Sequence, residues 1–216
     1  MTASLLALTR QRASHGSSSS RPSSVRIHPQ APRPTLRLSF PANDSLPRAH
    51  YWKIEAGYVR TIAWDTEGET ITLGIWGPGE LVTTAFSSSQ AIELQCLTPV
   101  VVTQFQPSAT DIDQLLRRQV QNLEEIFQLN RIRSADQRLL ALLTWIGSRF
   151  GQVSASGYRL SLKELNFTHQ SLAELCGLTR VTVTKALSRY REIGTLQKLS
   201  PEDWFIPRSA LSSGFA

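Results

Sequence analysis

The sequence predicts an α+β fold in which an antiparallel β-roll is followed by a long helix and then by a helix-turn-helix. Three patterns support this expectation. Apolar and polar residues alternate in short segments between residues 51 and 105, apolar residues recur at helical spacing over 111–132, and a small residue, a glycine and an apolar residue have helix-turn-helix spacing around Gly177. With 216 residues, 41% of them hydrophobic, the chain can bury a core.

Residues 1–38 are rich in arginine and serine and lack the periodic apolar residues that packing needs, so we expect a disordered basic tail. The first 50 residues hold seven arginines and one acid, a balance of +6 that equals the net charge of the whole chain. The basic character therefore belongs to the tail and is no argument for DNA binding elsewhere. The tail could be a solvated arm, a transit peptide, an arm on DNA phosphate, or the product of a wrongly chosen upstream start codon.

Short strands separated by turn residues are predicted from residue 51 onward, within an expected β-domain over residues 39–110. Segments 58–64 and 69–76 flank the sequence DTEG, in which Gly68 can adopt the positive φ of a hairpin turn. Segments 91–97 and 99–105 are two further strand candidates. Together they predict a small antiparallel roll or barrel, which could enclose a ligand or be a plain scaffold.

A helix is predicted over residues 111–132, because apolar residues recur there at gaps of three and four. So wide an apolar face could pack on the β-domain or pair with a copy of itself, and we favour pairing. The expected dimer interface consists of Ile112, Leu116, Val120, Leu123 and Phe127.

A further helix is predicted at the start of the C-terminal domain, residues 133–216. Ser134 has capping-box spacing to Gln137, and Gly147 and Gly151 are expected to mark the end of the helix.

The helix-turn-helix prediction depends on the joint spacing of several residues. Thr168 can cap one helix, Gly177 can form the turn, and Thr179 can cap the next helix. Because two helices cross closely in this motif, the residue four before the glycine must be small and the residue six after it apolar. Ala173 and Val183 meet both requirements.

The helix that follows Gly177 is predicted to enter the major groove of DNA, where short Thr and Val side chains fit close to the bases. Arg180 and Lys185 can bond guanine, and Val181 can meet a thymine methyl. The expected base contacts are Arg180, Val181, Thr184 and Lys185, and Thr184 could also donate to phosphate. The expected phosphate contacts are Thr168, His169, Gln170, Thr179, Thr182 and Arg189.

The order of β-roll, long helix and the segment HQSLAELCGLTRVTVTKAL resembles the Crp/Fnr family of bacterial transcription regulators, over about residues 50–206. The resemblance implies a winged helix-turn-helix, a homodimer joined through residues 111–132, double-stranded DNA with a palindromic operator, and RNA polymerase as a partner. The segment TRVTVTK is most similar to the family's cyanobacterial global nitrogen regulators, which implies a nutrient-status regulator. Val181 replaces a glutamate that contacts cytosine in other members, which favours a GTA-like half-site.

The β-domain resembles the cyclic-nucleotide-binding-like effector domain of the family but lacks residues that known effectors need. Segment 87–94 supplies no cation for a cyclic phosphate, so cyclic AMP is not expected. The chain has two cysteines, too few for the four-thiolate iron–sulfur cluster of the oxygen-sensing branch. Arg117 and Arg118 are weak candidates for effector binding, being more typical of a charged helix face, and the effector stays unknown.

The histidines are too scattered to indicate catalysis or a metal site. His15 and His28 lie in the tail, while His50 and His169 stand apart. We therefore expect a regulator and no enzyme; the alternatives are a DNA-binding protein whose β-roll is a ligand-free interaction surface, and an enzyme that uses the β-domain cavity. No apolar run approaches the roughly 18 to 20 residues that cross a bilayer, so we expect a cytoplasmic protein without a membrane partner.

Overall fold

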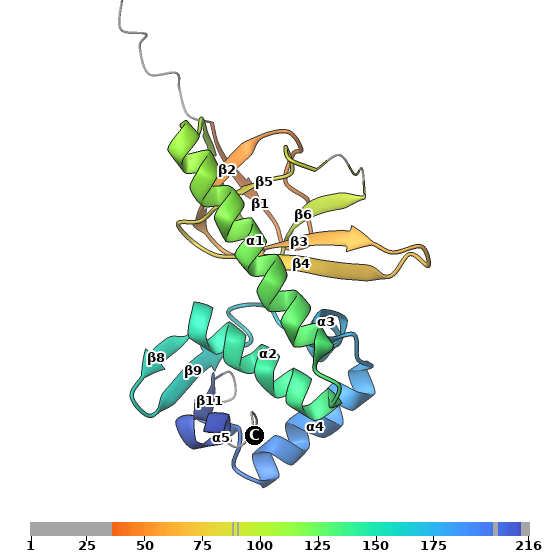
Figure 1. The fold of residues 1–216 in the computed structure, drawn as a ribbon. Helices are drawn as coiled ribbons and strands as arrows, with labels where there is room; N and C mark the ends of the chain where they lie inside the picture. Colours follow the sequence, from red (N-terminus) through yellow and green to blue (C-terminus); the bar gives the residue numbers. More distant parts are fainter. Residues whose placement is uncertain (1–35, 88, 90, 201–202, 213–216) are drawn as a thin grey trace, which may run out of the picture. The chain divides into compact units, whose positions relative to one another are not determined.

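The computed structural model describes residues 36–87, 89, 91–200 and 203–212, so most of the expected basic tail lies outside the described residues. The described part begins with strands and continues through a long helix, α1, into a region of helices and short strands (Figure 1). The first seven strands are β1 (Arg37–Phe40), β2 (Tyr51–Ala56), β3 (Val59–Trp64), β4 (Thr70–Trp76), β5 (Leu81–Thr83), β6 (Ile92–Cys96) and β7 (Val100–Phe105).

These strands form two antiparallel sheets, with the orders β1-β7-β2-β5 and β4-β3-β6. The four strands predicted from alternation are confirmed as β3, β4, β6 and β7, and Gly68 has the expected positive φ of 82° in the β3–β4 turn. Strands β1, β2 and β5 were not among the predicted strands. β1 begins at Arg37, so residues 37–38 of the expected tail belong to the sheet.

The two sheets enclose a hydrophobic core of their own. The alternating residues of β2 and β7 supply its centre, because side chains two positions apart point to the same face of a strand. Its fully buried members include Trp52, Ile54, Leu94, Val100 and Val102.

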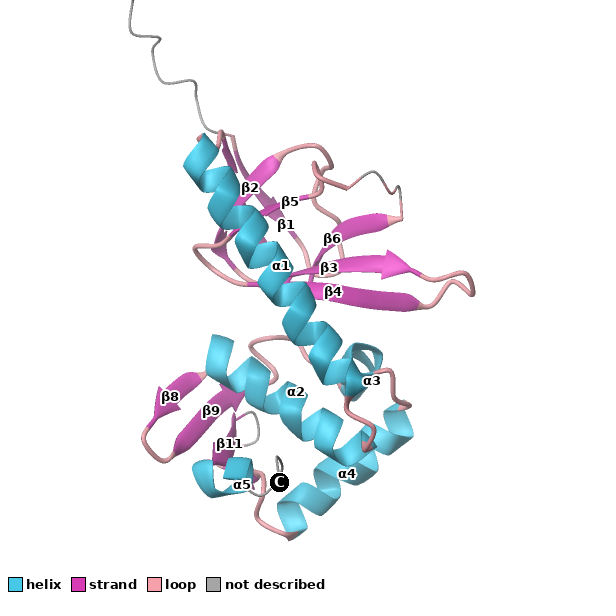
Figure 2. Ribbon diagram, viewed as in Figure 1, coloured by secondary structure: helices cyan, strands magenta, loops and turns pink. Residues whose placement is uncertain are grey.

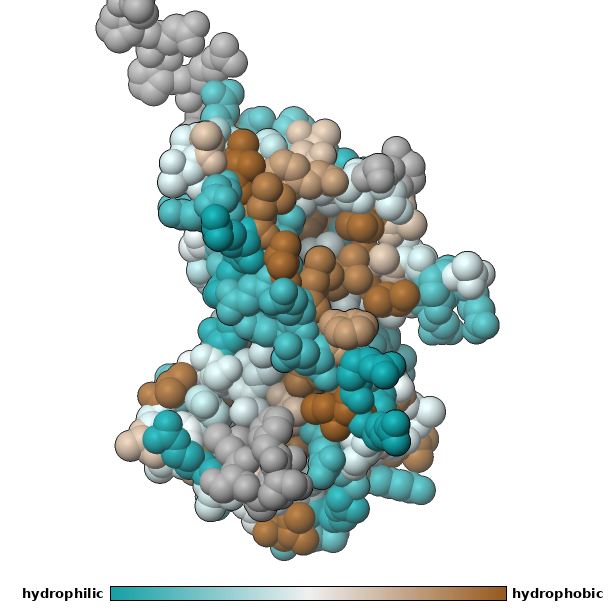
Figure 3. Space-filling view, in the orientation of Figure 1, coloured by the Kyte–Doolittle hydropathy of each residue, from teal (hydrophilic) through white to brown (hydrophobic). Residues whose placement is uncertain are grey.

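Helix α1 (Ala109–Arg131) is the long helix that the sequence predicts, and it begins two residues earlier than expected. A capping box between Ser108 and Asp111 fixes its start. One face is buried through Leu115, Asn122 and Ile126. A neighbouring face leaves large apolar side chains exposed, visible as brown surface along the helix (Figure 3).

The C-terminal region contains α2 (Ala135–Phe150), β8 (Gln152–Ser154), β9 (Gly157–Ser161), α3 (His169–Cys176), α4 (Arg180–Glu192), β10 (Gln197–Lys198), β11 (Asp203–Pro207) and α5 (Arg208–Ser212). The strands form an antiparallel sheet of order β10-β11-β9-β8, the small sheet expected of a winged helix-turn-helix. The α+β fold class is therefore confirmed.

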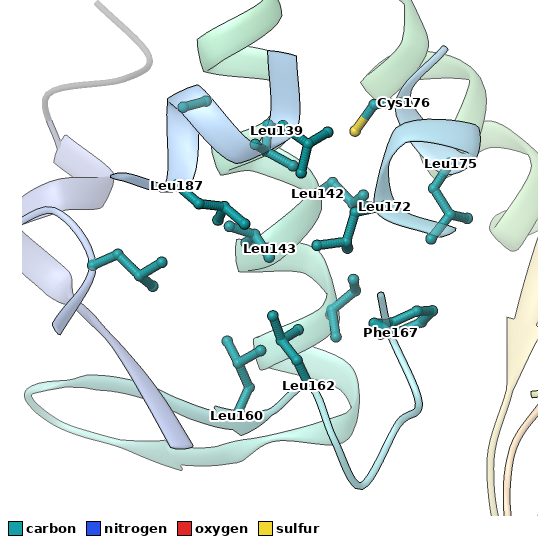
Figure 4. Close-up of a cluster of buried hydrophobic side chains, with 14 of the residues drawn as sticks. Leu139, Leu142, Leu143, Leu160, Leu162, Phe167, Leu172, Leu175, Cys176 and Leu187 are labelled. Carbon is teal, nitrogen blue, oxygen red and sulfur yellow. The ribbon is translucent and has the colours of Figure 1, made fainter. Parts of the chain in front are cut away.

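The core of this region consists mainly of leucines from α2, α3, α4 and the segment after β9 (Figure 4).

One prediction about α2 was wrong. The helix does end at Gly151, but Gly147 lies inside it, where a Cβ atom would come within 2.9 Å of the Tyr158 Cβ. Gly147 therefore serves the close approach of α2 to β9 and does not terminate the helix.

Candidate DNA-binding site

Local hydrogen bonds fix the ends of α3 and α4, which lie next to each other (Figure 2). The Thr168 hydroxyl accepts from the Ser171 backbone N–H at 3.1 Å, and the Ser171 hydroxyl accepts from the Thr168 backbone N–H at 2.7 Å. Gly177 ends α3 in the left-handed conformation, with φ 57°. The Thr179 hydroxyl then accepts from the Thr182 N–H at 3.1 Å. The predicted caps and turn are thus present, with Ser171 as an additional partner.

The close crossing of α3 and α4 buries the residues that the spacing singled out. Ala173 and Val183 are buried, and Leu187 follows one turn later in the same core (Figure 4). A larger side chain at position 173 would force the helices apart, because cores are packed without spare volume.

The outward face of α4 carries the residues expected to contact bases. Arg180, Val181 and Lys185 are exposed, and Val181 is an apolar side chain 62% exposed on a polar surface. Among the described residues, neither Arg180 nor Lys185 forms an ion pair. Two unneutralised cations at one end of a helix can bond phosphate oxygens or the acceptor atoms of guanine.

Thr184 is exposed but already hydrogen-bonded within the protein. Its hydroxyl lies 2.9 Å from the Arg180 carbonyl oxygen and 2.9 Å from Nδ1 of His169. The single hydroxyl proton is used in this network, so the side chain offers DNA an acceptor rather than the donor that the sequence suggested. His169 is half-buried, and burial, followed by the charges of Arg180 and Arg191, lowers its pKa.

Four further residues of the expected phosphate contacts also have partners in the protein. Arg189 forms an ion pair with Asp136 of α2, and Gln170 donates to the Glu174 carboxylate at 3.3 Å. The hydroxyls of Thr179 and Thr182 lie 2.8 Å apart. Arg189 and Gln170 would have to exchange these partners to bind a phosphate, whereas the exposed Thr168 remains at the outer end of α3.

Two polar contacts that no local sequence pattern indicates join this C-terminal region to the β-region, which we define as the two sheets formed by β1–β7. Arg60 of β3 bonds the Glu174 carboxylate at 2.9 Å and the Gln95 side-chain oxygen at 2.8 Å. Asn166, which precedes α3, donates to the Leu97 carbonyl at 2.7 Å. Nothing local in the sequence pairs residues 60 and 174, since the contact depends on the tertiary fold.

The β-region contains a cavity of about 360 Å³ against α1. Apolar side chains and hydroxyls line it, including Trp76, Phe86, Leu123, Thr61 and Thr84, and no ionisable side chain does so in the described part of the chain. The segment 87–94 indeed brings no cation of its own. Arg48 lies outside the cavity lining and donates to the carbonyls of Ser89 and Ile92 at 2.9 Å and 2.6 Å.

Neither arginine suggested as an effector contact lines this cavity. Arg117 pairs with Asp113 at 2.8 Å on the exposed side of α1. Arg118 bonds Glu80 at 3.2 Å, and the same carboxylate oxygen accepts from Arg149 at 2.7 Å. The sequence therefore failed to show that Arg118 belongs to an ion network between α1, α2 and the turn before β5.

Arg149 is the least exposed member of that network. Its guanidinium carbon lies 5.8 Å, 5.4 Å and 5.2 Å from the ring centroids of Trp76, Trp145 and Phe150. Burial lowers the pKa of Arg149, and the Glu80 carboxylate opposes that shift.

The described residues contain no group of three or more His, Cys, Asp or Glu side chains arranged to hold a metal ion. They also contain no helix with the length and apolarity that a membrane crossing requires.

Known proteins resemble the chain in sequence and in fold. The model of the Crp-like helix-turn-helix domain matches residues 137–207. The Regulatory protein CysR of Synechococcus elongatus is 41% identical over 147 residues, which cover 68% of this chain and 71% of that protein.

Solved structures extend the likeness to the whole described fold. FixK2 of Bradyrhizobium japonicum superposes with a TM-score of 0.66 at 16% identity, covering 82% of this chain and 94% of that chain. A CRP/FNR-family transcriptional regulator of Thermus thermophilus gives a TM-score of 0.64 at 20% identity, and the match covers 83% of this chain and 97% of that chain. The chain belongs to the Crp/Fnr family of DNA-binding transcription regulators, a family without enzymatic activity.

Proposed function

We propose that this Crp/Fnr regulator binds a two-fold-symmetric operator as a homodimer and responds to nutrient status in a cyanobacterium. The observation that carries the proposal is the outward face of α4, where Arg180 and Lys185 stand exposed and without ion-pair partners among the described residues. The similarity of TRVTVTK to nitrogen regulators and the likeness to CysR of Synechococcus elongatus support the nutrient role.

Dimerisation through α1 is the second part of the proposal. Leu116, Val120, Leu123 and Phe127 are 38%, 54%, 46% and 67% exposed, and Ile112 is half-buried beside them. These side chains lie three and four residues apart, so they form one stripe along the helix. Burying such a stripe against its copy removes apolar surface from water, at about 25 cal/mol per Å².

Base contacts are assigned to Arg180, Val181, Thr184 and Lys185. Arg180 and Lys185 would bond guanine, while the exposed Val181 would meet a thymine methyl, in keeping with a GTA-like half-site. Thr184, whose hydroxyl proton is bonded to the Arg180 carbonyl, would accept a hydrogen bond from a base through its hydroxyl oxygen. The phosphate contacts would come from Thr168, His169, Gln170, Thr179, Thr182 and Arg189.

The domain division proposed with this function follows the elements of the chain. Residues 1–38 would be a basic tail, except that β1 begins at Arg37 and takes residues 37–38 into the sheet. Residues 39–110 would be the effector domain. Residues 111–132 would be the dimerisation helix and 133–216 the winged helix-turn-helix. The protein would act in the cytoplasm together with RNA polymerase.

The cavity against α1 is the candidate effector site. Its described lining is apolar or uncharged, so a cyclic phosphate would find no counter-charge there. An iron–sulfur cluster does not fit either, because it needs four thiolates, whereas the chain has two cysteines, Cys96 and Cys176, and both are buried. The effector itself remains unassigned.

Selection from a pool of random duplexes with the full-length protein tests the proposal. We expect enrichment of a palindrome with half-sites about one helical turn apart, centre to centre. Repeating the selection with an extract of small metabolites would show whether an effector changes affinity. Recovery of an unenriched pool, with and without the extract, would contradict operator binding.

A further inference from the structure

The bond between His169 and Thr184 determines which nitrogen of the histidine carries the proton. The Thr184 hydroxyl has one proton, and its oxygen lies 2.9 Å from the Arg180 carbonyl, which can only accept. That proton therefore points to the carbonyl. His169 Nδ1, 2.9 Å from the same hydroxyl oxygen, must then be the donor. The neutral ring is fixed as the Nδ1–H tautomer, and its Nε2 has a lone pair.

Burial and the nearby positive charges both favour the neutral form of the ring in the free protein. Burial comes first among the causes that lower the pKa of His169, and Arg180 and Arg191, both on α4, follow. On its own helix, the Glu174 carboxylate is engaged by Arg60 and Gln170. Because the ring is neutral, Nε2 can only accept, and it cannot bond a phosphate oxygen, which also only accepts.

Position 169 is nevertheless where a phosphate would come close. His169 is the first residue of α3, and the first helix of a helix-turn-helix crosses the DNA backbone. The start of a helix also favours an anion, because the helix dipole is positive there. A phosphate at this place adds negative charge beside the imidazole, which opposes the two arginines.

We propose that His169 takes up one proton from solvent at Nε2 as DNA binds, and donates that proton to a phosphate oxygen while Nδ1–H stays bonded to Thr184. This inference rests on the proposed DNA-binding function. On release of the DNA the Nε2 proton returns to solvent, and the ring becomes neutral again. His169 is thus a proton-linked contact, unlike the permanently charged arginines of α4.

The sign of the pH effect follows from the proton count. The complex holds one proton more per protomer than the free protein, so DNA affinity rises as the pH falls. The rise is confined to the window between the His169 pKa of the free protein, which lies below the ordinary value of 6.5, and its pKa in the complex. Within that window the affinity gain approaches about tenfold per pH unit for each protomer.

The test is the pH profile of binding to a mixed-sequence duplex of about 30 base pairs, since phosphate contacts do not depend on sequence. Fluorescence anisotropy at constant ionic strength, from about pH 5.5 to 8.5, should give a rising affinity for the wild type at low pH. His169→Gln should flatten the profile. The matched control, His50→Gln, changes a histidine whose Nδ1 also has a side-chain partner, the Gln104 amide, and should keep the wild-type slope.

Two further measurements separate the tautomer from the proton uptake. Thr184→Val removes the acceptor of Nδ1–H, so the neutral ring can place its proton on Nε2, and the slope should decrease. Nitrogen-15 NMR of the histidine rings should report Nδ1–H in the free wild type. Equal slopes for wild type and His169→Gln, or an Nε2–H tautomer in the free protein, would overturn this inference alone. Failure to bind any DNA at any pH would overturn the proposed function as well.

Discussion

Helices α1 and α4 both bury one face in a core, but their outward faces differ in chemistry. On α1 the outward face carries Leu116, Val120, Leu123 and Phe127, all large and apolar. On α4 it carries cations and hydroxyls, with Val181 as its one exposed large apolar side chain among the described residues.

The difference indicates two kinds of partner. An apolar stripe gains free energy when another apolar surface replaces water, whereas unpaired arginine and lysine gain most beside a polyanion. A copy of the same helix suits α1, and the DNA backbone and base edges suit α4. Each partner can be removed by a substitution on the corresponding helix, which gives the first predictions.

The largest effect is expected from placing charges in the α1 stripe. Leu123→Asp combined with Phe127→Asp should give monomers, because two unpaired carboxylates would be buried at the interface, at several kcal/mol each. Sedimentation velocity measures the outcome. Gln128→Asp, an exposed neighbour outside the stripe, is the control and should leave the dimer intact. An unchanged dimer in the double variant would show that α1 faces something else.

A smaller but still large effect is expected when the buried face of α4 is changed. Leu187→Ala should lower the free energy of unfolding by about 2–5 kcal/mol, because it leaves a cavity in a packed core. Chemical denaturation measures it, with the exposed Glu192→Ala as control. A loss no larger than that of the control would mean that α4 is not anchored at Leu187.

Substitutions on the outward face of α4 should change DNA binding without changing stability. Arg180→Ala should cost about 1–3 kcal/mol per half-site and relax the preference at one base pair. Thr182→Val should weaken binding to all sequences more evenly, and Val181→Glu should move the preference toward cytosine, whose N4 donates to a carboxylate. Selection on random duplexes compares the wild type with these three variants. The same operator from all four would place base recognition elsewhere.

Gly177→Ala tests the turn between the two helices and should have a modest effect. The left-handed conformation costs an L-residue about 1–2 kcal/mol, while an added Cβ would meet nothing closer than the Arg138 guanidinium at 3.8 Å. Thermal unfolding should therefore show a small loss of stability. A loss of stability as large as that expected for Leu187→Ala would mean that the turn has no room for a Cβ atom at position 177.

The smallest expected effect is none at all. Cyclic AMP at micromolar concentration should give no heat in calorimetry, because the described lining of the cavity against α1 has no cation for its phosphate. A saturable binding isotherm would contradict this view of the cavity. Arg48, whose guanidinium lies against the carbonyls of Ser89 and Ile92, would then be the first residue to substitute.

The features that the sequence predicted well have local causes. Gly177, Thr168 and Thr179 each act on backbone groups within a few residues, so their identity and spacing suffice to place the turn and caps. The start of α1 could also have been placed, because Ser108 and Asp111 have capping-box spacing. The prediction began at Asp111 because it followed the apolar period and not the cap.

The features that were missed depend on contacts between distant residues. β1 has four residues and gains its place by pairing with β7, some sixty positions later in the chain. Asn122 interrupts the buried face of α1, and its side chain accepts from Arg149. Arg118 resembles Arg117 in sequence, yet only Arg118 reaches Glu80. No local pattern distinguishes such pairs.

The hydrophobic core of the C-terminal region has a consequence for how the protein unfolds. Ile75 of β4 and Leu97, which follows β6, belong to the same buried cluster as Leu142, Leu172 and Val183. Unfolding of the helix-turn-helix would therefore expose apolar surface that the β-region also relies on. Calorimetry should show one cooperative transition rather than two, and a fragment cut between α1 and α2 should melt at a lower temperature than the same helices in the full chain.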